Sequence, residues 1–269
     1  MLRRVQRALL AGETGRLRAF DRDDWIDAST PLAEDGFPKV PAAYRHSSAP
    51  TFEAWLAAGV EHFTSMLEIL RAHGFDPDAA PRILDFGCSS GRTVRQWAAF
   101  DSPEVWGCEI DFDRVQWCKQ NLGERFKFVQ TRLRPPLPFE DRTFDLIYAG
   151  SVFTHISDHI DEWLLELRRT LRPGGLLFVT IHDETTWKIV NEEGSAVIGP
   201  AVARSSGQVR SELPADFIAV GRDAASQIFF RSSYFEQLCA PYFTVEEYRS
   251  KARGYQSAVL LRKPEEAGR

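Results

Sequence analysis

A glycine-rich turn directly follows a short apolar run near residue 85 of the 269-residue chain. The run ends around Asp85, and the turn is bounded by Gly87 and Gly91. Glycine is used where the backbone must come close to a ligand or adopt a positive φ, and a helix that starts after the turn offers free N–H groups. The carboxylate of Asp85 could pair with a cationic amine. These residues therefore predict a binding site for a ligand that carries a positive charge.

A second acid, Glu109, ends the next apolar run. In a doubly wound sheet the ligand lies in the crevice outside the carboxyl ends of the strands, and a carboxylate at this place accepts the hydroxyls of a ribose. On their own, Gly87 and Gly91 are equally well explained as an ordinary tight turn. Together with Asp85 and Glu109, they favour a site for a nucleoside with a positively charged tail.

The same turn partly matches two other motifs. A nicotinamide dinucleotide site expects G-x-G-x-x-G, which Gly87, Ser89 and Gly91 do not provide, so a dehydrogenase is disfavoured. The turn also fits the G-x-S-x-G nucleophile elbow of α/β-hydrolases, with Ser89 as the nucleophile and His155 or His182 as a triad partner. That elbow should follow several strands, whereas the preceding residues look largely helical or irregular. A hydrolase therefore stays as the alternative.

Short apolar runs alternate with amphipathic segments between Pro81 and Lys188. This alternation is typical of repeated βαβ units, which form a parallel sheet. The expected fold class is α/β: a doubly wound, mostly parallel, Rossmann-like sheet of seven strands with a C-terminal antiparallel hairpin. We expect parallel strands at residues 82–86, 104–110, 126–130, 144–149 and 175–181, hairpin strands at 243–249 and 257–262, and helices over 51–73 and 233–240 and from near 91, 113 and 158.

Three segments differ in their sequence pattern. Residues 1–50 combine Arg- and Asp-rich stretches with several prolines, so we expect an N-terminal helix followed by an irregular arm. Residues 51–269 form the main domain, whose first helix buries one face because apolar residues recur at helical spacing. Within this domain, residues 187–228 show no convincing period and are interpreted as an inserted cap or lid.

Composition and charge disfavour several classes of protein. With 43% hydrophobic residues and a net charge of −5, the chain is globular in character and lacks the basic excess of nucleic-acid binders. The four cysteines form no CxxC pair, and Asp183 with Glu184 is too small a cluster for magnesium, so no metal is expected. No apolar stretch reaches the ~20 residues of a membrane-spanning helix. The chain is therefore expected to be a soluble, cytoplasmic protein without a nucleic-acid partner.

Four pieces of the chain, taken in order, resemble the class I S-adenosylmethionine-dependent methyltransferases. The order of the pieces makes the resemblance far more specific than any one of them. It implies S-adenosyl-L-methionine as the cofactor and methyl transfer as the activity. The matching pieces are Ile83–Gly91, Gly107–Asp111, Leu137–Phe139 followed by Phe144–Ile147, and Leu171–Gly175.

The resemblance also implies which residues contact the cofactor. Asp85, Gly87 and the backbone of residues 88–91 would hold the methionine part, while Glu109 would hold the ribose and Ile110 would pack on the adenine. The full set of cofactor-binding residues expected in this way is Asp85, Gly87, Cys88, Ser89, Gly91, Glu109, Ile110 and Ser151.

Two positions depart from the pattern of the family. Ser89 stands where many relatives have glycine, so its side chain must point away from the cofactor or donate a hydrogen bond to the cofactor's carboxylate. Relatives often have an Asp after the third strand that contacts the adenine amine, whereas residues 131–133 are Thr, Arg and Leu. Adenine recognition is therefore expected to differ from that of many relatives.

The acceptor is expected to be a small molecule or a sugar. Ser151–His155 and Gly254–Ser257 are similar to a bacterial subgroup associated with the modification of sugars or cell-surface polysaccharides. This similarity favours O-methylation of a hydroxyl by in-line displacement. A third alternative is a module that binds the cofactor without catalysis and serves a partner protein.

Methyl transfer converts a sulfonium into a neutral thioether, so the protein mainly aligns the acceptor, the methyl group and the sulfur. A hydroxyl acceptor must lose its proton as the new bond forms, which a histidine or carboxylate can assist. His155 and His182 follow the fourth and fifth predicted strands, and Asp183 could orient His182 or act itself. A purely structural role is equally compatible with each residue. The expected catalytic residues are therefore His182 first, then His155 and Asp183.

Overall fold

The computed structural model describes residues 32–45, 49, 51–191, 212–221 and 226–265. The N-terminal helix expected within residues 1–50 would lie before residue 32 and is outside these ranges. Much of the expected cap, residues 192–211, is outside them as well.

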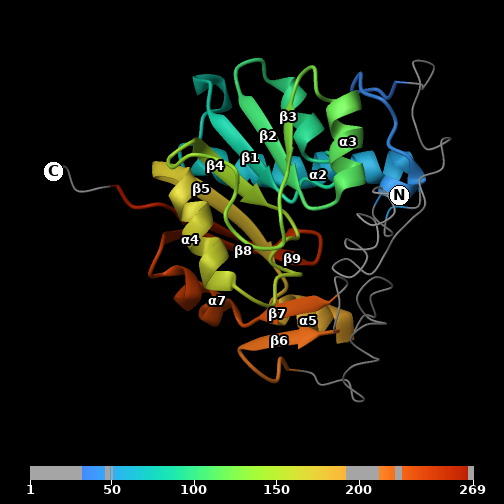
Figure 1. Ribbon diagram of the computed structural model, residues 1–269. Coiled ribbons are helices and arrows are strands. Elements are labelled where there is room, and N and C mark those ends of the chain that lie inside the picture. Colours follow the sequence, from blue (N-terminus) through green and yellow to red (C-terminus); the bar gives the residue numbers. More distant parts are fainter. Residues whose placement is uncertain (1–31, 46–48, 50, 192–211, 222–225, 266–269) are drawn as a thin grey trace, which may run out of the picture.

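A seven-stranded sheet forms the centre of the described chain (Figure 1). Its strands are β1 (Arg82–Phe86), β2 (Glu104–Glu109), β3 (Lys127–Gln130), β4 (Phe144–Ala149), β5 (Leu171–Ile181), β8 (Thr244–Arg253) and β9 (Gln256–Arg262). They lie in the order β3-β2-β1-β4-β5-β9-β8. The first five strands pair in parallel, and β9 runs antiparallel to both β5 and β8. This confirms the predicted fold class, including the C-terminal hairpin.

The strand order changes direction between β1 and β4. From β1 the chain moves outward to β2 and β3, and it then returns to place β4 on the other side of β1. The connections after β1 and β4 therefore leave the sheet in opposite directions and open a crevice at their carboxyl ends. Asp85 and Tyr148, which are paired in register on β1 and β4, lie at this crevice.

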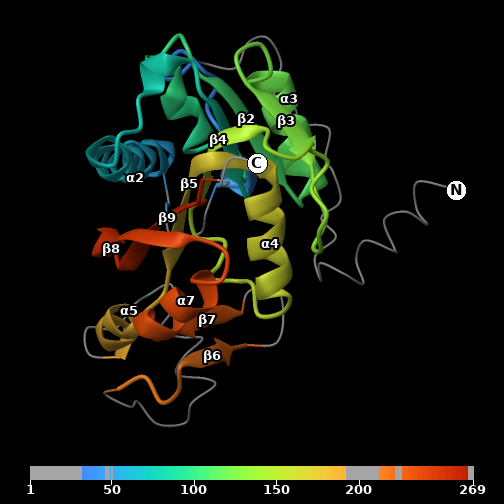
Figure 2. The ribbon, with the colours of Figure 1, turned by 90° about the vertical axis from the view of Figure 1, so that its left-hand side faces the viewer.

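Helices cover both faces of the sheet. They are α2 (Phe52–Ala72), the 3-10 helix η4 (Val94–Ala99), α3 (Phe112–Asn121), α4 (Ile160–Thr170) and α7 (Ser232–Cys239). α2, η4 and α3 share one apolar core, in which Trp97 is buried, and α4 and α7 share the other, which contains Trp163 and Phe235. Figure 2 shows α2 and α4 on opposite sides of the sheet. This two-faced burial explains why the strands are apolar without alternation.

Several element bounds differ from the sequence prediction. The helix expected from near residue 91 is the short η4, and α4 starts at Ile160 because His159 adopts a left-handed backbone with φ of 59°. β5 begins at Leu171 rather than 175, and β8 continues to Arg253 rather than 249. The extension of β8 carries its last residues to the carboxyl edge of the sheet, where the crevice lies.

Two short strands were not predicted within the insert. β6 (Phe217–Val220) and β7 (Gln227–Phe230) pair antiparallel (Figure 1). β7 is attached to the end of β5, because Phe229 forms a parallel bridge with His182 and the Phe230 N–H donates to the His182 carbonyl at 2.8 Å. Strands of four residues are too short to give a clear period in the sequence. The described end of the insert is therefore part of the packed domain.

A buried ion pair fastens the N-terminal arm to the domain. The Arg95 side chain on η4 is fully buried and donates to Asp35 from Nε and from Nη2, the latter at 2.6 Å. Its guanidinium also lies 5.5–5.6 Å from the ring centres of Phe37, Phe52 and Trp55. Since an uncompensated buried charge is costly, this contact holds the described arm against η4.

Removal of the arm's carboxylate should destabilise the protein. We expect Asp35→Ala to lower the free energy of unfolding by about 3 kcal/mol, because it leaves the Arg95 guanidinium buried without a countercharge. Glu68→Ala breaks an exposed pair with Arg249 and should cost less than about 1 kcal/mol. Chemical denaturation of both variants measures the difference. Equal, small costs would show that the buried guanidinium does not depend on Asp35.

Candidate functional site

The glycine turn forms a tight loop after β1. Gly87 and Ser89 have positive φ values of 83° and 51°. The N–H groups of Gly87 and Cys88 both donate to the Cys108 carbonyl on β2, at 2.9 and 3.0 Å. A Cβ on Gly87 would collide with the side chain of Val152, which follows β4. Gly87 is therefore required by its backbone conformation and by the close approach of the neighbouring loop.

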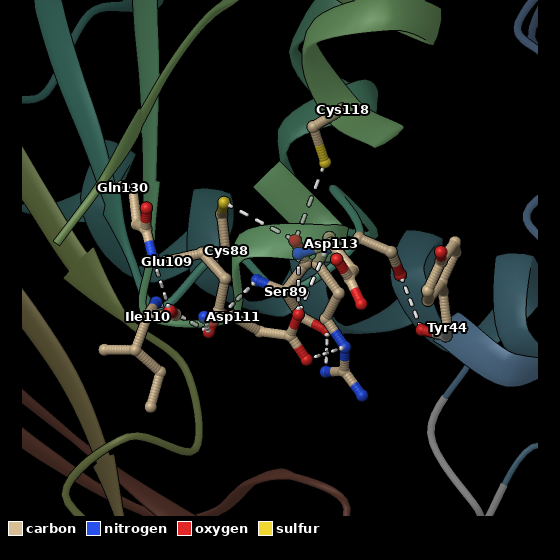
Figure 3. A network of polar contacts seen from close by, with 11 residues as sticks. Tyr44, Cys88, Ser89, Glu109, Ile110, Asp111, Asp113, Cys118 and Gln130 are labelled. Atoms are coloured by element: carbon tan, nitrogen blue, oxygen red, sulfur yellow. Dashed lines mark hydrogen bonds and ion pairs between the residues drawn. The ribbon is translucent and has the colours of Figure 1, made fainter. Parts of the chain in front are cut away.

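Glu109, the last residue of β2, is joined directly to this loop. Its Oε2 accepts a hydrogen bond from the Ser89 N–H at 2.8 Å (Figure 3). Its Oε1 accepts from the N–H groups of Ile110 and Asp111 at 2.8 and 3.0 Å. Three donors fix the carboxylate, and Oε2 keeps a lone pair that can accept from a ligand hydroxyl. The loop and the acid therefore lie at one edge of the crevice.

Next to Glu109, the same edge of the crevice carries an exposed apolar side chain, Ile110, and a hydroxyl without a partner among the described residues, that of Thr131. The side chain of Ile110 is 40% exposed, and its carbonyl accepts from Gln130 at 3.2 Å. Thr131, which follows β3, is buried, and its hydroxyl has no hydrogen-bond partner among the described residues. A purine has an apolar face and a polar edge, so this pair of features fits an adenine. Thr131 is one of the positions where the sequence departs from the family.

Asp85 lies beneath the loop and is only 4% exposed. Burial raises the pKa of Asp85 to about 7, while a hydrogen bond with Tyr148 and the charges of Arg253 and Arg92 oppose this shift. A carboxyl group in this environment is stabilised in its charged form by a nearby cation. The ammonium of an amino-acid tail fits that requirement.

The N-terminal arm reaches the same loop. Ser90 donates from Oγ to the Tyr44 carbonyl at 2.9 Å (Figure 3), and Tyr44 belongs to a 3-10 turn, η2 (Ala42–Tyr44). Gly91, with φ of 78°, donates from its N–H to the Cys88 carbonyl at 2.9 Å. The loop is thus held from β2 on one side and from the arm on the other. No motif in the sequence indicates the contact with the arm, because it joins segments 46 positions apart through a backbone carbonyl.

The two histidines occupy different environments. His155 is exposed, and its Nδ1 donates to the Ser226 carbonyl at 2.8 Å, which leaves Nε2 as the acceptor. Partial desolvation of the ring lowers the pKa of His155 below its usual value of 6.5. His182 is 1% exposed, and burial lowers its pKa to about 3. His182 is therefore neutral at pH 7, the lowered pKa of His155 favours its neutral form, and of the two side chains only His155 is exposed.

Gln256 links the histidine region to the loop after β4. Its amide nitrogen donates to Ser151 Oγ at 2.8 Å and lies 3.3 Å from His182 Nε2. Its amide oxygen accepts from Thr180 at 2.8 Å, and Thr180 in turn accepts from the Ser151 N–H at 2.7 Å. Ser151 is thereby placed at the carboxyl end of β4. Gln256 lies in the Gly254–Ser257 segment singled out in the sequence, although its own role was not predicted.

Asp183 is fully buried and serves as the N-cap of α5 (Glu184–Ile189). One carboxylate oxygen accepts from the N–H and the hydroxyl of Thr186, and the other accepts from Tyr248 and Ser257. These four hydrogen bonds use the lone pairs of both oxygens. The structure therefore separates Asp183 from the exposed part of the crevice.

Ser89 is not arranged as a nucleophile. Its hydroxyl accepts from Arg114 at 2.6 Å. Within the described residues, no histidine is hydrogen bonded to it, and β1 opens the sheet instead of following several strands. A nucleophile elbow requires a base at the serine and earlier strands before it. The geometry thus gives the hydrolase alternative no support.

The residues at the crevice fit the cofactor implied by the resemblance. S-adenosylmethionine carries a ribose, an adenine and an amino-acid tail, for which the crevice offers Glu109, Ile110 with Thr131, and Asp85. Among the described residues, no cluster of His, Cys, Asp or Glu is placed to hold a metal ion. Within the same ranges, no helix has both the length and the hydropathy that a membrane span needs.

Comparison with known proteins gives the same class. Residues 84–179 match the family model of the methyltransferase domain. A sterol 24-C-methyltransferase of Gibberella zeae is 31% identical over 160 residues, which is 58% of this chain and 40% of that protein. A ubiquinone biosynthesis O-methyltransferase of Mesorhizobium japonicum is 30% identical over 139 residues, covering 49% of this chain and 53% of that protein. The chain thus spans about half or less of the length of these curated relatives.

A solved structure extends the likeness to most of the fold. An S-adenosylmethionine-dependent methyltransferase from Mesorhizobium loti superposes with a TM-score of 0.56 at 15% identity, over 74% of this chain and 98% of that chain. The fold is a doubly wound α/β domain, and the residues at its carboxyl edge fit a nucleoside. Residues 84–179 therefore match a methyltransferase domain, and the fold around them is that of an S-adenosylmethionine-dependent methyltransferase.

Loss of the Glu109 carboxylate should weaken cofactor binding. We expect Glu109→Ala to reduce the affinity for S-adenosylhomocysteine by about 1.5–3 kcal/mol, the scale of lost hydrogen bonds to a charged group. Glu104→Ala, at the opposite end of β2, is the matched control and should leave the affinity unchanged. Isothermal titration calorimetry measures both. An unchanged dissociation constant in Glu109→Ala would show that another group holds the ribose.

Asp85 should make cofactor binding depend on pH. Its pKa of about 7 means that the carboxylate which pairs with the ligand ammonium is fully ionised only above pH 7. Affinity for S-adenosylhomocysteine should therefore fall by up to about tenfold per pH unit below that value. Methylthioadenosine, which lacks the amino-acid tail, should bind without this dependence. Flat calorimetric profiles for both ligands would mean that Asp85 does not pair with the ammonium.

Proposed function

We propose that this protein uses S-adenosylmethionine to methylate a hydroxyl oxygen of a small molecule or sugar. The observation that carries the proposal is the 2.8 Å hydrogen bond from the Ser89 N–H to Glu109 Oε2, because it brings the glycine loop and the ribose-binding acid to one cleft. The name of the similar ubiquinone biosynthesis O-methyltransferase supports transfer to oxygen. The similarity of Ser151–His155 and Gly254–Ser257 to a sugar-modifying subgroup supports a hydroxylated acceptor.

The protein's own residues bind and align the reactants. The cofactor, when bound, supplies an electrophilic methyl group on a sulfonium. Glu109 and Asp85 would hold the ribose and the ammonium of the cofactor at the carboxyl ends of β2 and β1. Ser151, fixed at the carboxyl end of β4 by Gln256 and Thr180, is placed to contact the cofactor or the acceptor. Such alignment accounts for most of the rate that this reaction needs.

His155 is the proposed general base. Its Nδ1–H donates to the Ser226 carbonyl, so its unprotonated Nε2 faces outward and can take the hydroxyl proton. The sequence ranks His182 ahead of His155, but a ring that is 1% exposed with a pKa of about 3 is a poor proton acceptor for an external group. We assign His182 and Asp183 positioning roles. His182 contacts Gln256, which holds Ser151, and Asp183 caps α5.

The insert is proposed to cover the acceptor side of the cleft. Its described end, β7, packs on the end of β5 beside His182, which is the half of the sheet that does not hold the nucleoside. A cap at this place would exclude water while the methyl group is transferred. Acceptor selection is therefore assigned to this side.

Transfer of a radiolabelled methyl group tests the proposal. Incubation with methyl-tritiated S-adenosylmethionine and a metabolite extract should label a small molecule, and Glu109→Ala should abolish most of that labelling. The released product should be S-adenosylhomocysteine in equal amount. Tight cofactor binding without labelling in any extract would favour the non-catalytic alternative instead.

Replacement of the base should slow turnover without affecting cofactor binding. With an acceptor found in that assay, we expect His155→Ala to lower kcat by about 100-fold or more and to leave the affinity for S-adenosylhomocysteine unchanged. Because the pKa of His155 lies below 6.5, wild-type kcat at saturating cofactor should be flat near pH 7 and fall as the pH drops through that pKa.

His159→Ala is the matched control for the base. His159 lies four residues away, at the start of α4, where its Nδ1 pairs with Glu162. Its replacement should leave kcat and the pH profile unchanged. A large loss of kcat in His182→Ala, with wild-type turnover in His155→Ala, would assign the base to His182 as the sequence ranked it.

A further inference from the structure

Two guanidinium groups lie close together at the carboxyl edge of the sheet. Arg92 follows the glycine loop, and Arg253 ends β8 at the turn into β9. Each guanidinium is in electrostatic contact with Asp85, and Arg92 also acts on Arg253. Within the described residues, neither guanidinium forms a hydrogen bond or an ion pair. By contrast, Arg95, three residues after Arg92, forms an ion pair with Asp35.

Glycines make room for both side chains. Arg253 Nη1 occupies the space that a Cβ on Gly150 would need, directly after β4. A Cβ on Gly59 of α2 would come within 2.8 Å of Arg92 Cγ. Neither position could carry a larger residue without moving an arginine. Both arginine side chains are therefore accommodated by glycines, Arg253 beside Gly150 after β4 and Arg92 beside Gly59 on α2.

The charges in this cluster do not balance. Asp85 is the described acid that acts on both arginines, and its pKa of about 7 means that it carries only part of a negative charge at neutral pH. His62 of α2 faces both arginines and is neutral, because burial and their charges lower its pKa to about 2. Burial and Arg92 lower the pKa of Arg253 to about 10. The remaining groups beside the arginines are the phenols of Tyr148 and Tyr255.

The position of the cluster identifies the ligand that would complete it. Glu109 marks the ribose at β2, and Asp85 marks the amino-acid tail at β1. Gly150, where the Arg253 guanidinium lies, is one strand further along, about 4.8 Å beyond β1. The unbalanced positive charge is thus on the acceptor side of the nucleoside. Guanidinium pairs favour planar oxyanions, to which they can donate several hydrogen bonds.

We infer that Arg92 and Arg253 bind an oxyanion of the acceptor, so that the substrates are small hydroxylated molecules carrying a carboxylate or phosphate group. The inference rests on the proposed function, because it assigns the acceptor of the same site. The arginines orient the acceptor by its anionic end, and the hydroxyl to be methylated lies between them and the cofactor. Asp85 remains available for the ammonium of the cofactor.

Calorimetry on protein saturated with S-adenosylhomocysteine tests this inference with malonate and inorganic phosphate as probes. Malonamide is the neutral analogue of malonate. We expect at least one of the two anions to bind and malonamide not to bind. Arg253→Gln and Arg92→Gln should each weaken anion binding at least tenfold. Arg172→Gln removes an exposed guanidinium at the opposite edge of the sheet, paired with Asp145, and should have no effect.

Two further measurements separate anion binding from other roles. The Tm of Arg253→Gln without anion should equal or exceed that of the wild type, because the change removes a charge that has no ion-pair partner among the described residues. The affinity of Arg253→Gln for S-adenosylhomocysteine should stay within twofold of wild type. A lower affinity for S-adenosylhomocysteine with unchanged affinity for methylthioadenosine would assign the guanidinium to the cofactor's own carboxylate and overturn the inference.

The remaining outcomes distinguish this inference from the proposed function. If S-adenosylhomocysteine binds but neither anion does, or if Arg253→Gln binds the anion as the wild type does, the inference is wrong and the proposed function stands. If the wild type does not bind S-adenosylhomocysteine, the proposed function is wrong and the inference fails with it.

Discussion

The hydrogen bond between the Ser89 N–H and Glu109 Oε2 is the constraint on which the site depends. Ser89 adopts a left-handed backbone with φ of 51°, which costs a residue with a side chain about 1–2 kcal/mol. A hydrogen bond to a charged carboxylate offsets a cost of that size. The bond fixes the loop after β1 to the end of β2, and the Ile110 and Asp111 N–H groups fix the same carboxylate from its other side. The conformation of the glycine loop and the position of the Glu109 carboxylate therefore depend on each other.

The sheet divides the site into two halves with different physical demands. The half at β1, β2 and β3, the proposed nucleoside side, is built from backbone donors and a fixed acid, and little of it depends on long side chains. The half at β4, β5, β8 and β9 is built from side chains that cross between strands, such as Gln256 and Arg253. Where the two halves meet, the partly ionised Asp85 and the guanidinium groups of Arg92 and Arg253 are unfavourable in the free protein. Groups that lower the stability of the free protein are typical of a binding site, because a ligand can compensate them.

The sequence predicts the first half of the site better than the second. Apolar runs with turn residues between them are local signals, so the parallel strands and the spacing from Asp85 to Glu109 could be found without coordinates. Gln256 and Arg253 act on residues about a hundred positions away, and only the pairing of β9 with β5 brings them there. The complete burial of Asp183 was missed because two of its partners, Tyr248 and Ser257, lie on β8 and β9 and reach it only through the fold.

The short strand β7 determines which of the two histidines can accept a proton from an external group. Within β7 and the residue before it, Phe229 packs its ring 5.2 Å from His182, while the Ser226 carbonyl takes the Nδ1 proton of His155. The same segment thus removes one histidine from solvent and sets the tautomer of the other. Both histidines follow strands at the carboxyl edge, so their sequence positions are equivalent. Only the packing of β7, an element with no clear signal in the sequence, makes them different, and it leaves His155 as the histidine whose Nε2 can meet an acceptor.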